Sequence, residues 1–388
     1  MEYVAKLNRW MIEEGRCSND PVAVVSRYCA TLVEAGVPLW RANIGQRFSN
    51  PLLIAWGVVW TPESTESYDV THARLLTDGY VGSSFEYILE NNRPLHKSLR
   101  GLDPENDHVS YLELAEAGCT DYYATLLYYG DGSRHGCTFA TQDSEGFTQS
   151  HLEMIEETKL GLSCALEPVT MRKSTKSLLR TYLGDGPSGE VWNGTIRRGE
   201  RRTLDAVVMF SDLRGFTELS NLHAEREIFE ALDGYFDVVV QAVEKMGGDV
   251  LKFMGDGILS VFPILDPGEH NEKCKQATLA ARQILDNLAE LNHTRSSNDK
   301  QLMNIGIGIN AGQVSYGNIG SPGRLDFTVL GNAVNVASRI EGLTKIVGER
   351  VLATAVVADA VPEYFVKSGY HNIKGIAEPV EVFGLVES

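Results

Sequence analysis

The sequence predicts two α+β domains joined by a helical linker. Its 388 residues are enough for two domains of ordinary size. Segments with the helical spacing of apolar residues alternate along the chain with short β-rich runs. A basic helical stretch followed by turn-forming residues interrupts this pattern between 168 and 195. We therefore expect an N-terminal domain over 1–167, a linker over 168–195 and a second domain over 196–388.

Composition and charge narrow the class of protein. The chain is 43% hydrophobic and 22% charged, which is typical of a soluble globular protein. A formal net charge of −17 disfavours non-specific binding to nucleic acid or to anionic membranes. We see no signal peptide and no run of about 18–20 apolar residues, so no membrane insertion is expected. The six scattered cysteines favour buried free thiols and a cytoplasmic location.

The first domain alternates helix and strand. Residues 21–34 are predicted to form an amphipathic helix, and 52–60 form a buried β-rich run. Two strands, 122–130 and 134–141, are expected to pair as a hairpin about a Gly-Asp-Gly turn. A helix over 151–168 leads out of the domain.

This order of elements resembles domains of the GAF or PAS kind. Such a resemblance implies a sensor-type module that responds to an unknown small-molecule or protein effector. The alternative is a plain dimerisation scaffold, and both interpretations stay open. Most of the clustered aromatic side chains are expected to pack in the core rather than line a pocket. They are Trp40, Trp56, Trp60, Tyr122, Tyr123, Tyr128 and Tyr129.

The second domain begins with a buried strand that ends at Ser211-Asp212. A helix over 224–246, a strand–turn–strand hairpin within 249–262 and a second long helix over 272–293 follow. Two further strands are expected within 303–320, and then a strand that runs into a helix. The order β-α-β-β-α-β predicts a ferredoxin-like core.

Two aspartates are candidates for a metal site. Asp212 follows the first strand of this core, and Asp256 lies in the glycine-flanked turn of the hairpin. In such a core the strand and the hairpin lie side by side, so both carboxylates can converge at one edge of the sheet. Paired carboxylates suit Mg²⁺ or Mn²⁺. Either aspartate alone is more often an ordinary turn residue.

Three sequence blocks make the interpretation specific. FSDLRGFTELS (210–220), LKFMGDGILSVF (251–262) and FTVLGNAVNVASRIEGLT (327–344) resemble the signature blocks of class III adenylate and guanylate cyclases. The resemblance covers about 196–388. It implies two divalent metal ions bound by Asp212, Asp256 and the carbonyl of Leu213.

The resemblance also assigns substrate-binding residues. The backbone N–H groups of Gly215, Phe216 and Thr217 are expected to bind the triphosphate. Lys252 matches the lysine that donates to adenine N1, and Thr328 matches the position whose side chain accepts from the 6-amino group. Guanylate cyclases of this family place Glu and Cys at these two positions. The pattern therefore favours ATP as substrate and cyclic AMP and pyrophosphate as products.

The last matched residues act on the ribose and the phosphates. Asn335 and Arg339 are four apart on a helix and match the transition-state pair of the family. Lys374 matches its phosphate-binding lysine. In this family the site lies between two subunits. Because one chain carries the full set, the resemblance implies a head-to-tail homodimer whose monomer is inactive.

Three rival functions remain as alternatives. A guanylate cyclase would share the fold and the metal site. A diguanylate cyclase is suggested by Gly247-Gly248-Asp249, but Val250 follows where an acidic residue should stand, so we interpret this motif as a turn before a strand. A catalytically silent regulatory or scaffold protein is the third. The presence of both aspartates, Asn335 and Arg339 argues against it.

Overall fold

The structure is a computed structural model, and it describes residues 2–216, 224–374, 376 and 378–386. The chain divides into two compact units, Met1–Thr181 and Tyr182–Ser388. The segment predicted as a linker is shared between them, because helix α5 (Gln149–Leu183) continues through its first half. Within the described residues, no helix combines the length and the apolar character that crossing a membrane requires.

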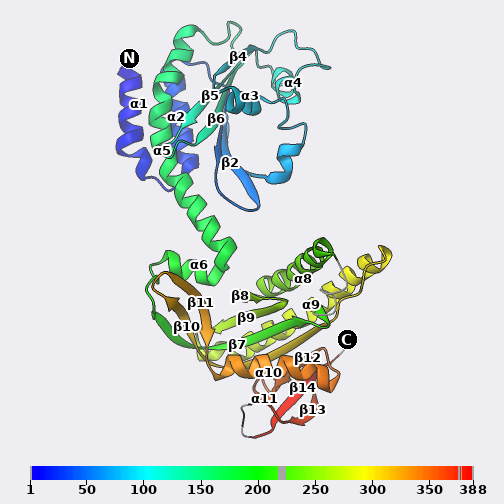
Figure 1. Ribbon diagram of the computed structural model, residues 1–388. Helices are drawn as coiled ribbons and strands as arrows, with labels where there is room; N and C mark the ends of the chain where they lie inside the picture. The colour runs from blue at the N-terminus through cyan, green and yellow to red at the C-terminus, as the bar shows by residue number, and fades with distance from the viewer. Residues whose placement is uncertain (1, 217–223, 375, 377, 387–388) are drawn as a thin grey trace. The chain divides into compact units, whose positions relative to one another are not determined.

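The N-terminal unit is a six-stranded antiparallel sheet with helices on both faces (Figure 1). The sheet order is β3-β2-β1-β6-β5-β4. The strands are β1 (Arg41–Arg47), β2 (Leu53–Trp60), β3 (Thr65–Thr71), β4 (Leu95–Ser98), β5 (Asp121–Tyr128) and β6 (Arg134–Thr141). The helices are α1 (Glu2–Glu13), α2 (Pro21–Glu34), α3 (Ser84–Asn91), α4 (Val109–Glu116) and α5. This arrangement is mixed helix and sheet, and the likeness to GAF or PAS domains stays a prediction.

Each face of this sheet has its own core. Helices α1, α2 and α5 pack on one face, where most of the predicted aromatic residues are buried. They include Trp56, Trp60, Tyr123 and Tyr129. Helices α3 and α4 pack on the other face with Tyr122, while Tyr128 is exposed.

Local signals set the bounds of α2 as the sequence predicts. The carboxylate of Asp20 caps the helix by accepting from the N–H groups of Val22 (2.9 Å) and Ala23 (3.1 Å). Pro21 occupies the first turn, where a missing N–H costs nothing. The buried face includes Val25, Cys29 and Leu32, whose spacing of three and four residues is that of the predicted amphipathic helix. The described chain has no disulfide, and four of its six cysteines are buried.

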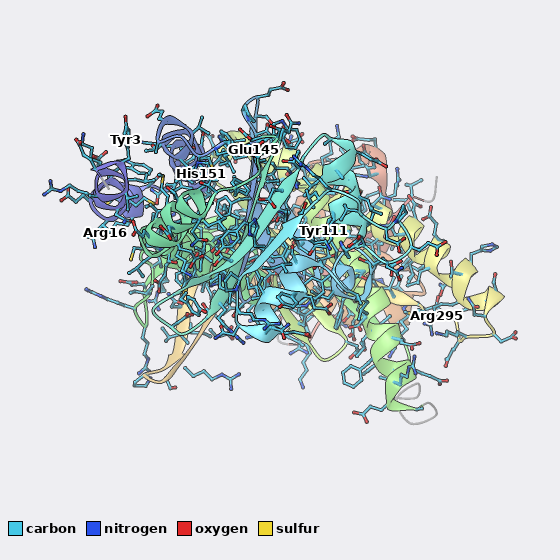
Figure 2. All side chains as sticks on the ribbon, turned by 90° about the horizontal axis from the view of Figure 1, so that it is seen from above. Tyr3, Arg16, Tyr111, Glu145, His151 and Arg295 are labelled. Carbon is cyan, nitrogen blue, oxygen red and sulfur yellow. The ribbon has the colours of Figure 1, made fainter. Side chains whose placement is uncertain are left out.

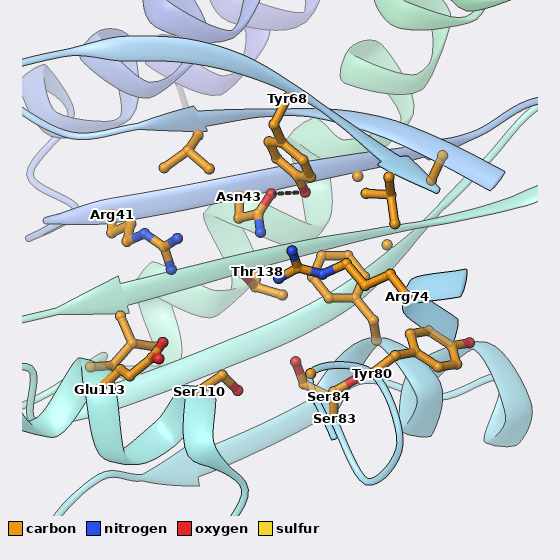
Figure 3. A pocket seen from close by; sticks show the side chains of 18 of the residues that line it. Arg41, Asn43, Tyr68, Arg74, Tyr80, Ser83, Ser84, Ser110, Glu113 and Thr138 are labelled. Carbon is orange, nitrogen blue, oxygen red and sulfur yellow. Dashed lines mark hydrogen bonds between the residues drawn. The ribbon is translucent and has the colours of Figure 1, made fainter. Parts of the chain in front are cut away.

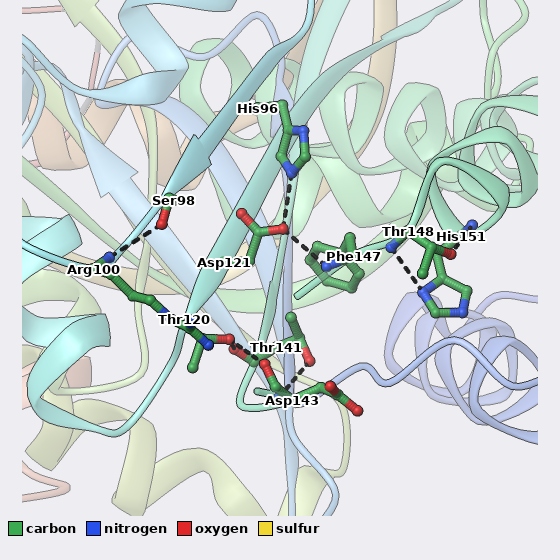
Figure 4. A network of polar contacts seen from close by, with 10 residues as sticks. All are labelled: His96, Ser98, Arg100, Thr120, Asp121, Thr141, Asp143, Phe147, Thr148 and His151. Carbon is green, nitrogen blue, oxygen red and sulfur yellow. Dashed lines mark hydrogen bonds and ion pairs between the residues drawn. The ribbon is translucent and has the colours of Figure 1, made fainter. Parts of the chain in front are cut away.

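A buried carboxylate joins the edge of this sheet to the start of α5 (Figure 4). Asp121, which is 8% exposed, accepts from the N–H of Phe147 at 2.9 Å and lies 2.8 Å from Nε2 of His96. Burying a carboxylate without such partners would be costly. The contacts therefore fix the β6–α5 connection against β4 and β5.

The C-terminal unit is built on an eight-stranded sheet (Figure 1). Its strands are β7 (Arg201–Leu213), β8 (Asp249–Met254), β9 (Gly257–Ile264), β10 (Ile305–Ser321), β11 (Arg324–Leu330), β12 (Val351–Thr354), β13 (Phe365–His371) and β14 (Val380–Leu385). Its helices are α6 (Asp185–Trp192), α8 (Glu225–Lys245), α9 (His270–Ser297), α10 (Asn332–Val347) and α11 (Ala355–Ala358).

The sheet order β13-β14-β12-β10-β7-β9-β8 places β7 between β10 and β9. The order β7-α8-β8-β9-α9-β10 along the chain is the predicted β-α-β-β-α-β core. Helices α8 and α9 bury the main apolar core on one face, and α10 packs over β10, β7 and β12 on the other. Arg295 lies in the last turn of α9 (Figure 2). Its Nε donates to the carbonyl of Gln301 at 2.8 Å, which binds the chain after the helix to the helix end.

One strand prediction is wrong. The sequence predicts two strands within 303–320, whereas the structure has the single long strand β10. Its first part pairs with β7 from Ile305 to Gly317, and its last part pairs with β11 from Ser315 to Ser321. Because a partner strand accompanies β10 throughout, its glycines do not end it.

Candidate active site

The two predicted metal-binding aspartates lie together at one end of β7. Asp212 is the penultimate residue of β7, and Asp256 lies in the turn that joins β8 to β9. Antiparallel pairing of β7 with β9 brings this turn to the end of β7. A Cβ atom on Gly257 would lie 3.4 Å from Oδ1 of Asp212, so the side chain of Asp212 reaches the turn. Gly255 adopts a φ of +70°, which favours glycine at that turn position.

The electrostatics of this pair suit a cation. Partial burial, followed by the neighbouring carboxylate of Asp256, raises the pKa of Asp212 to about 6. The amine of Lys345 offsets part of this effect. The charge of Asp256 disfavours the ionised form of Asp212, and a divalent cation would relieve this repulsion. Carboxylate oxygens are the ligands that Mg²⁺ and Mn²⁺ prefer. The residues present therefore fit a metal, although no cluster of three His, Cys, Asp or Glu ligands was found among the described residues.

The predicted base-recognising residues lie on neighbouring strands. Lys252 is on β8 and the buried Thr328 is on β11, and these strands contact each other. The ammonium of Lys252 is not bonded to Thr328, however. It donates to the carboxylate of Asp326, two residues earlier on β11 and therefore on the same face of the strand. Sequence reasoning missed Asp326 because it stands just before the FTVLG block, outside the residues that the family resemblance assigns.

Asn335 and Arg339 lie on the exposed side of α10. The opposite side of the helix is buried against the sheet through Val336, Ala337 and Ile340. Among the described residues, the structure gives neither Asn335 nor Arg339 a side-chain partner. Both side chains are therefore free to contact a substrate, as the prediction requires.

The predicted phosphate-binding residues are only partly described. Gly215 follows the end of β7 with a φ of +75°, and Phe216 is half-buried against the core beneath α8 and α9. Thr217 lies outside the described residues. Lys374 is exposed between β13 and β14.

Comparisons with known proteins identify the family of the C-terminal unit. Residues 200–383 match the model of the adenylate and guanylate cyclase catalytic domain. These residues belong to that family. An adenylate cyclase of Anabaena cylindrica is 37% identical over 177 residues, which cover 44% of this chain and 34% of the relative. The chain thus spans about a third of the length of that relative.

Solved structures of cyclases are also similar. The structure of a bacterial light-regulated adenylyl cyclase is 30% identical, with a TM-score of 0.42, and the match covers 47% of this chain and 91% of that one. The guanylyl cyclase Cya2 is 29% identical, with a TM-score of 0.42, and covers 49% of this chain and 94% of that one. Both substrate classes are therefore represented among the neighbours of this cyclase domain.

A third acid, Glu341, lies beside the aspartate pair of the cyclase domain and was not predicted. Burial and the charge of Asp212 raise the pKa of Glu341 to about 7. A Cβ atom on Gly306, which pairs with Asp212 across β7 and β10, would lie 2.8 Å from Oε1 of Glu341. A Cβ atom on Gly308 would lie 2.3 Å from the backbone N of Glu341.

These two glycines of β10 let α10 approach the sheet closely enough to bring Glu341 to Asp212. Alternate glycines on one face of a strand mark a close approach of another backbone. The IGIGIN segment (305–310) carried that signal in the sequence.

Two cations accompany these acids. Lys345 lowers the pKa of both Asp212 and Glu341. Arg214 also lowers the pKa of Glu341, and its guanidinium donates to the carbonyl of Glu349 while its buried Nε has no partner among the described atoms. The cyclase domain thus supports its carboxylates with two cations in a chain of net charge −17.

Proposed function

We propose that the cyclase domain converts ATP to cyclic AMP and pyrophosphate at a site shared by two copies of the chain. The observation that carries this proposal is the convergence of Asp212 and Asp256 at the end of β7, inside a domain of the cyclase family. A divalent metal bound there would lower the pKa of the ribose 3′-OH and neutralise charge on the phosphates.

The other residues bind and orient the nucleotide. Lys252 donates to N1 of adenine, and the hydroxyl of Thr328 accepts from the 6-amino group. Asn335 orients the ribose, and Arg339 neutralises the charge that develops on the α-phosphate. Lys374 and the N–H groups that follow β7 bind the remaining phosphates. Each role follows from the family resemblance, and the exposure of Asn335 and Arg339 is compatible with it.

One observation favours GTP as a second candidate substrate. Asp326 places a carboxylate beside Lys252, and a carboxylate is the acceptor that the N1–H of guanine requires. Lys252 opposes this reading, because its ammonium offers only donors. The Lys252–Asp326 pair thus combines a donor suited to adenine with an acceptor suited to guanine.

The test is a cyclisation assay of the purified full chain with ATP and GTP in parallel, in Mn²⁺ and in Mg²⁺. We expect cyclic AMP to be the main product, and Asp212→Ala to abolish it. Asp205→Asn is the matched control, because Asp205 is exposed on the same strand outside the site. Absence of any cyclic nucleotide with either metal would refute a catalytic role, and a preference for GTP would refute the adenine assignment.

Complementation tests the shared site. Asp212→Ala and Arg339→Ala chains are each expected to be inactive alone. When they are mixed, the heterodimer has one site that takes Asp212 from one chain and Arg339 from the other, so activity should return. If the mixture stays inactive while size-exclusion chromatography shows dimers, the shared-site arrangement is wrong.

A further inference from the structure

The N-terminal unit contains a cavity of about 650 Å³ that the cyclase reaction does not use (Figure 3). It lies on the sheet face that carries α3 and α4, and β1, β2, β3 and β6 contribute to its wall. Its volume falls within the range of about 300–1,000 Å³ typical of small-molecule sites. Its lining mixes aromatic rings with polar side chains, including Trp40, Tyr68, Tyr80, Phe85, Ser84 and Thr138.

Three adjacent glycines lie in the sheet beside this cavity, and two of them, Gly45 and Gly136, line it. Gly45 on β1 pairs with Gly57 on β2 and with Gly136 on β6, so a row of residues without side chains crosses three strands. A Cβ atom would lie 2.9 Å from the ring of Phe85 at Gly45 and 2.5 Å from it at Gly136. At Gly57 it would lie 2.5 Å from the ring of Tyr68. The rings of Phe85 and Tyr68 therefore pack directly against the backbone of these glycines, and the cavity lies above the rings.

Cations outnumber anions around this space. Arg41, Arg47 and Arg74 line the cavity, and none of the three makes an ion pair or a side-chain hydrogen bond within the described part of the chain. The lining has two acids, Asp69 and Glu113. Because Asp69 already pairs with Lys173 at 3.0 Å, Glu113 is the acid that remains to balance the three arginines. An excess of guanidinium groups is unexpected in a chain of net charge −17.

The cations converge with neutral polar groups. Figure 3 shows Arg41 and Arg74 reaching into the same space from opposite sides. Both charges act on the hydroxyl of Tyr68 and partly offset the rise in its pKa that burial causes. This hydroxyl donates to Oδ1 of Asn43 at 2.6 Å. The guanidinium fork matches the geometry of carboxylate, sulfonate and phosphate groups.

We propose that this cavity binds a small organic anion with a planar apolar part. The arginines would bind the acidic group, and the rings of Tyr68 and Phe85 would contact the planar part. The proposal does not depend on the cyclase activity, because every residue that carries it lies in the N-terminal unit.

The test uses 1-naphthalenesulfonate as the probe and 1-naphthalenesulfonamide as its neutral counterpart. Each is titrated into the purified full chain by calorimetry, without metal or nucleotide. We expect saturable binding of one sulfonate per chain, and binding of the sulfonamide that is at least about tenfold weaker, since one lost charged contact is worth roughly that factor. Equal affinities for the two probes, or no saturable binding of the sulfonate, would overturn the proposal.

Variants locate the probe. Arg41→Gln and Arg74→Gln should each weaken sulfonate binding at least about tenfold, whereas Arg134→Gln, an exposed arginine of β6 outside the cavity, should change it less than about twofold. Val59→Trp places a large ring in the cavity from β2 and should also weaken binding. Circular dichroism identifies any variant that fails to fold. Binding that persists in the three cavity variants but is lost in Lys252→Ala would place the probe in the cyclase domain and overturn the proposal.

Discussion

Replacing Asp212 with asparagine is expected to stabilise the metal-free cyclase domain while abolishing its activity. Asparagine keeps the shape of the side chain but removes one of the two charges that repel each other at the end of β7. A pKa of about 6, against 3.8 for the free side chain, corresponds to about 3 kcal/mol between the two protonation states. Because the side chain is only half-buried, solvent screening reduces the expected gain to about 1 kcal/mol at pH 7.5.

Calorimetric unfolding of the full chain measures this gain. A gain of about 1 kcal/mol raises the melting temperature of a domain of about 200 residues by roughly 2–4 °C. The transition that Mn²⁺ raises in the unmodified protein identifies the cyclase domain. In EDTA, Asp212→Asn should raise that transition and Asp205→Asn should leave it unchanged. In Mn²⁺ the unmodified protein and the Asp205→Asn control should melt higher than Asp212→Asn, because only they bind the metal.

The raised pKa values of these carboxyl groups also determine the sign of the pH dependence of stability. The folded state raises the pKa of Asp212 to about 6 and that of Glu341 to about 7, so between about pH 4 and pH 7 it binds more protons than the unfolded state. The stability of the metal-free domain should therefore fall as pH rises through this window. The Asp212→Asn variant should show a shallower fall. A variant that melts lower than the unmodified protein in EDTA at pH 7.5 would refute the repulsion on which the metal site rests.

Three further variants test the packing of α10 on β10, the ion pair between Lys252 and Asp326, and the assigned role of Arg339. Gly308→Ala should destabilise the cyclase domain by about 1–3 kcal/mol in the same calorimetry, because its Cβ would lie 2.4 Å from the carbonyl of Ala337; Gly342→Ala, with open space around it, should not. Asp326→Asn should lower kcat/KM for ATP about tenfold, because it releases Lys252 from its partner. In a Lys252→Ala background the same substitution should have no further effect. Independent effects in the double variant would contradict a joint role. Arg339→Ala should lower kcat about 10²–10³-fold without changing the melting temperature, and a kcat within about threefold of the unmodified protein would exclude its assigned role.

Much of the fold could be predicted from the sequence because the signals are local. The cap at Asp20, the apolar stripe of α2 and the glycine-flanked turn at Asp256 each act within a few residues. The order of helices and strands then left few topologies for the C-terminal unit. The turn at Gly247 precedes β8, as predicted, and Asp249 is the first residue of that strand. Its carboxylate accepts from the N–H of Gly186 at 2.9 Å.

The single strand β10 shows where local signals mislead. The sequence predicted two strands within 303–320, and this segment contains glycines at 312, 317 and 320, residues that weaken an isolated strand. Pairing with β7 and then with β11 supplies the hydrogen bonds that keep the strand continuous. That pairing joins residues far apart in the sequence, so no window along the chain contains it.

The residues expected to carry chemistry were determined by the sequence alone, because reaction roles constrain residue type and spacing. Asp212, Asp256, Asn335 and Arg339 could be named without coordinates. The tertiary structure decided what surrounds them. Glu341 reaches Asp212 only because two glycines of β10 admit α10, and Lys252 meets Asp326 only because β11 lies against β8.

In the N-terminal unit, too, the sequence predicts local elements, whereas the tertiary structure decides which distant residues meet. The local pattern predicted α2, β2, β5, β6 and the start of α5, and most of the aromatic side chains pack in the core as expected. Neither periodicity nor composition could place Gly45, Gly57 and Gly136 side by side, or turn Arg41 and Arg74 toward one space. Those placements depend on strand register and on packing between distant segments, which only the folded chain determines.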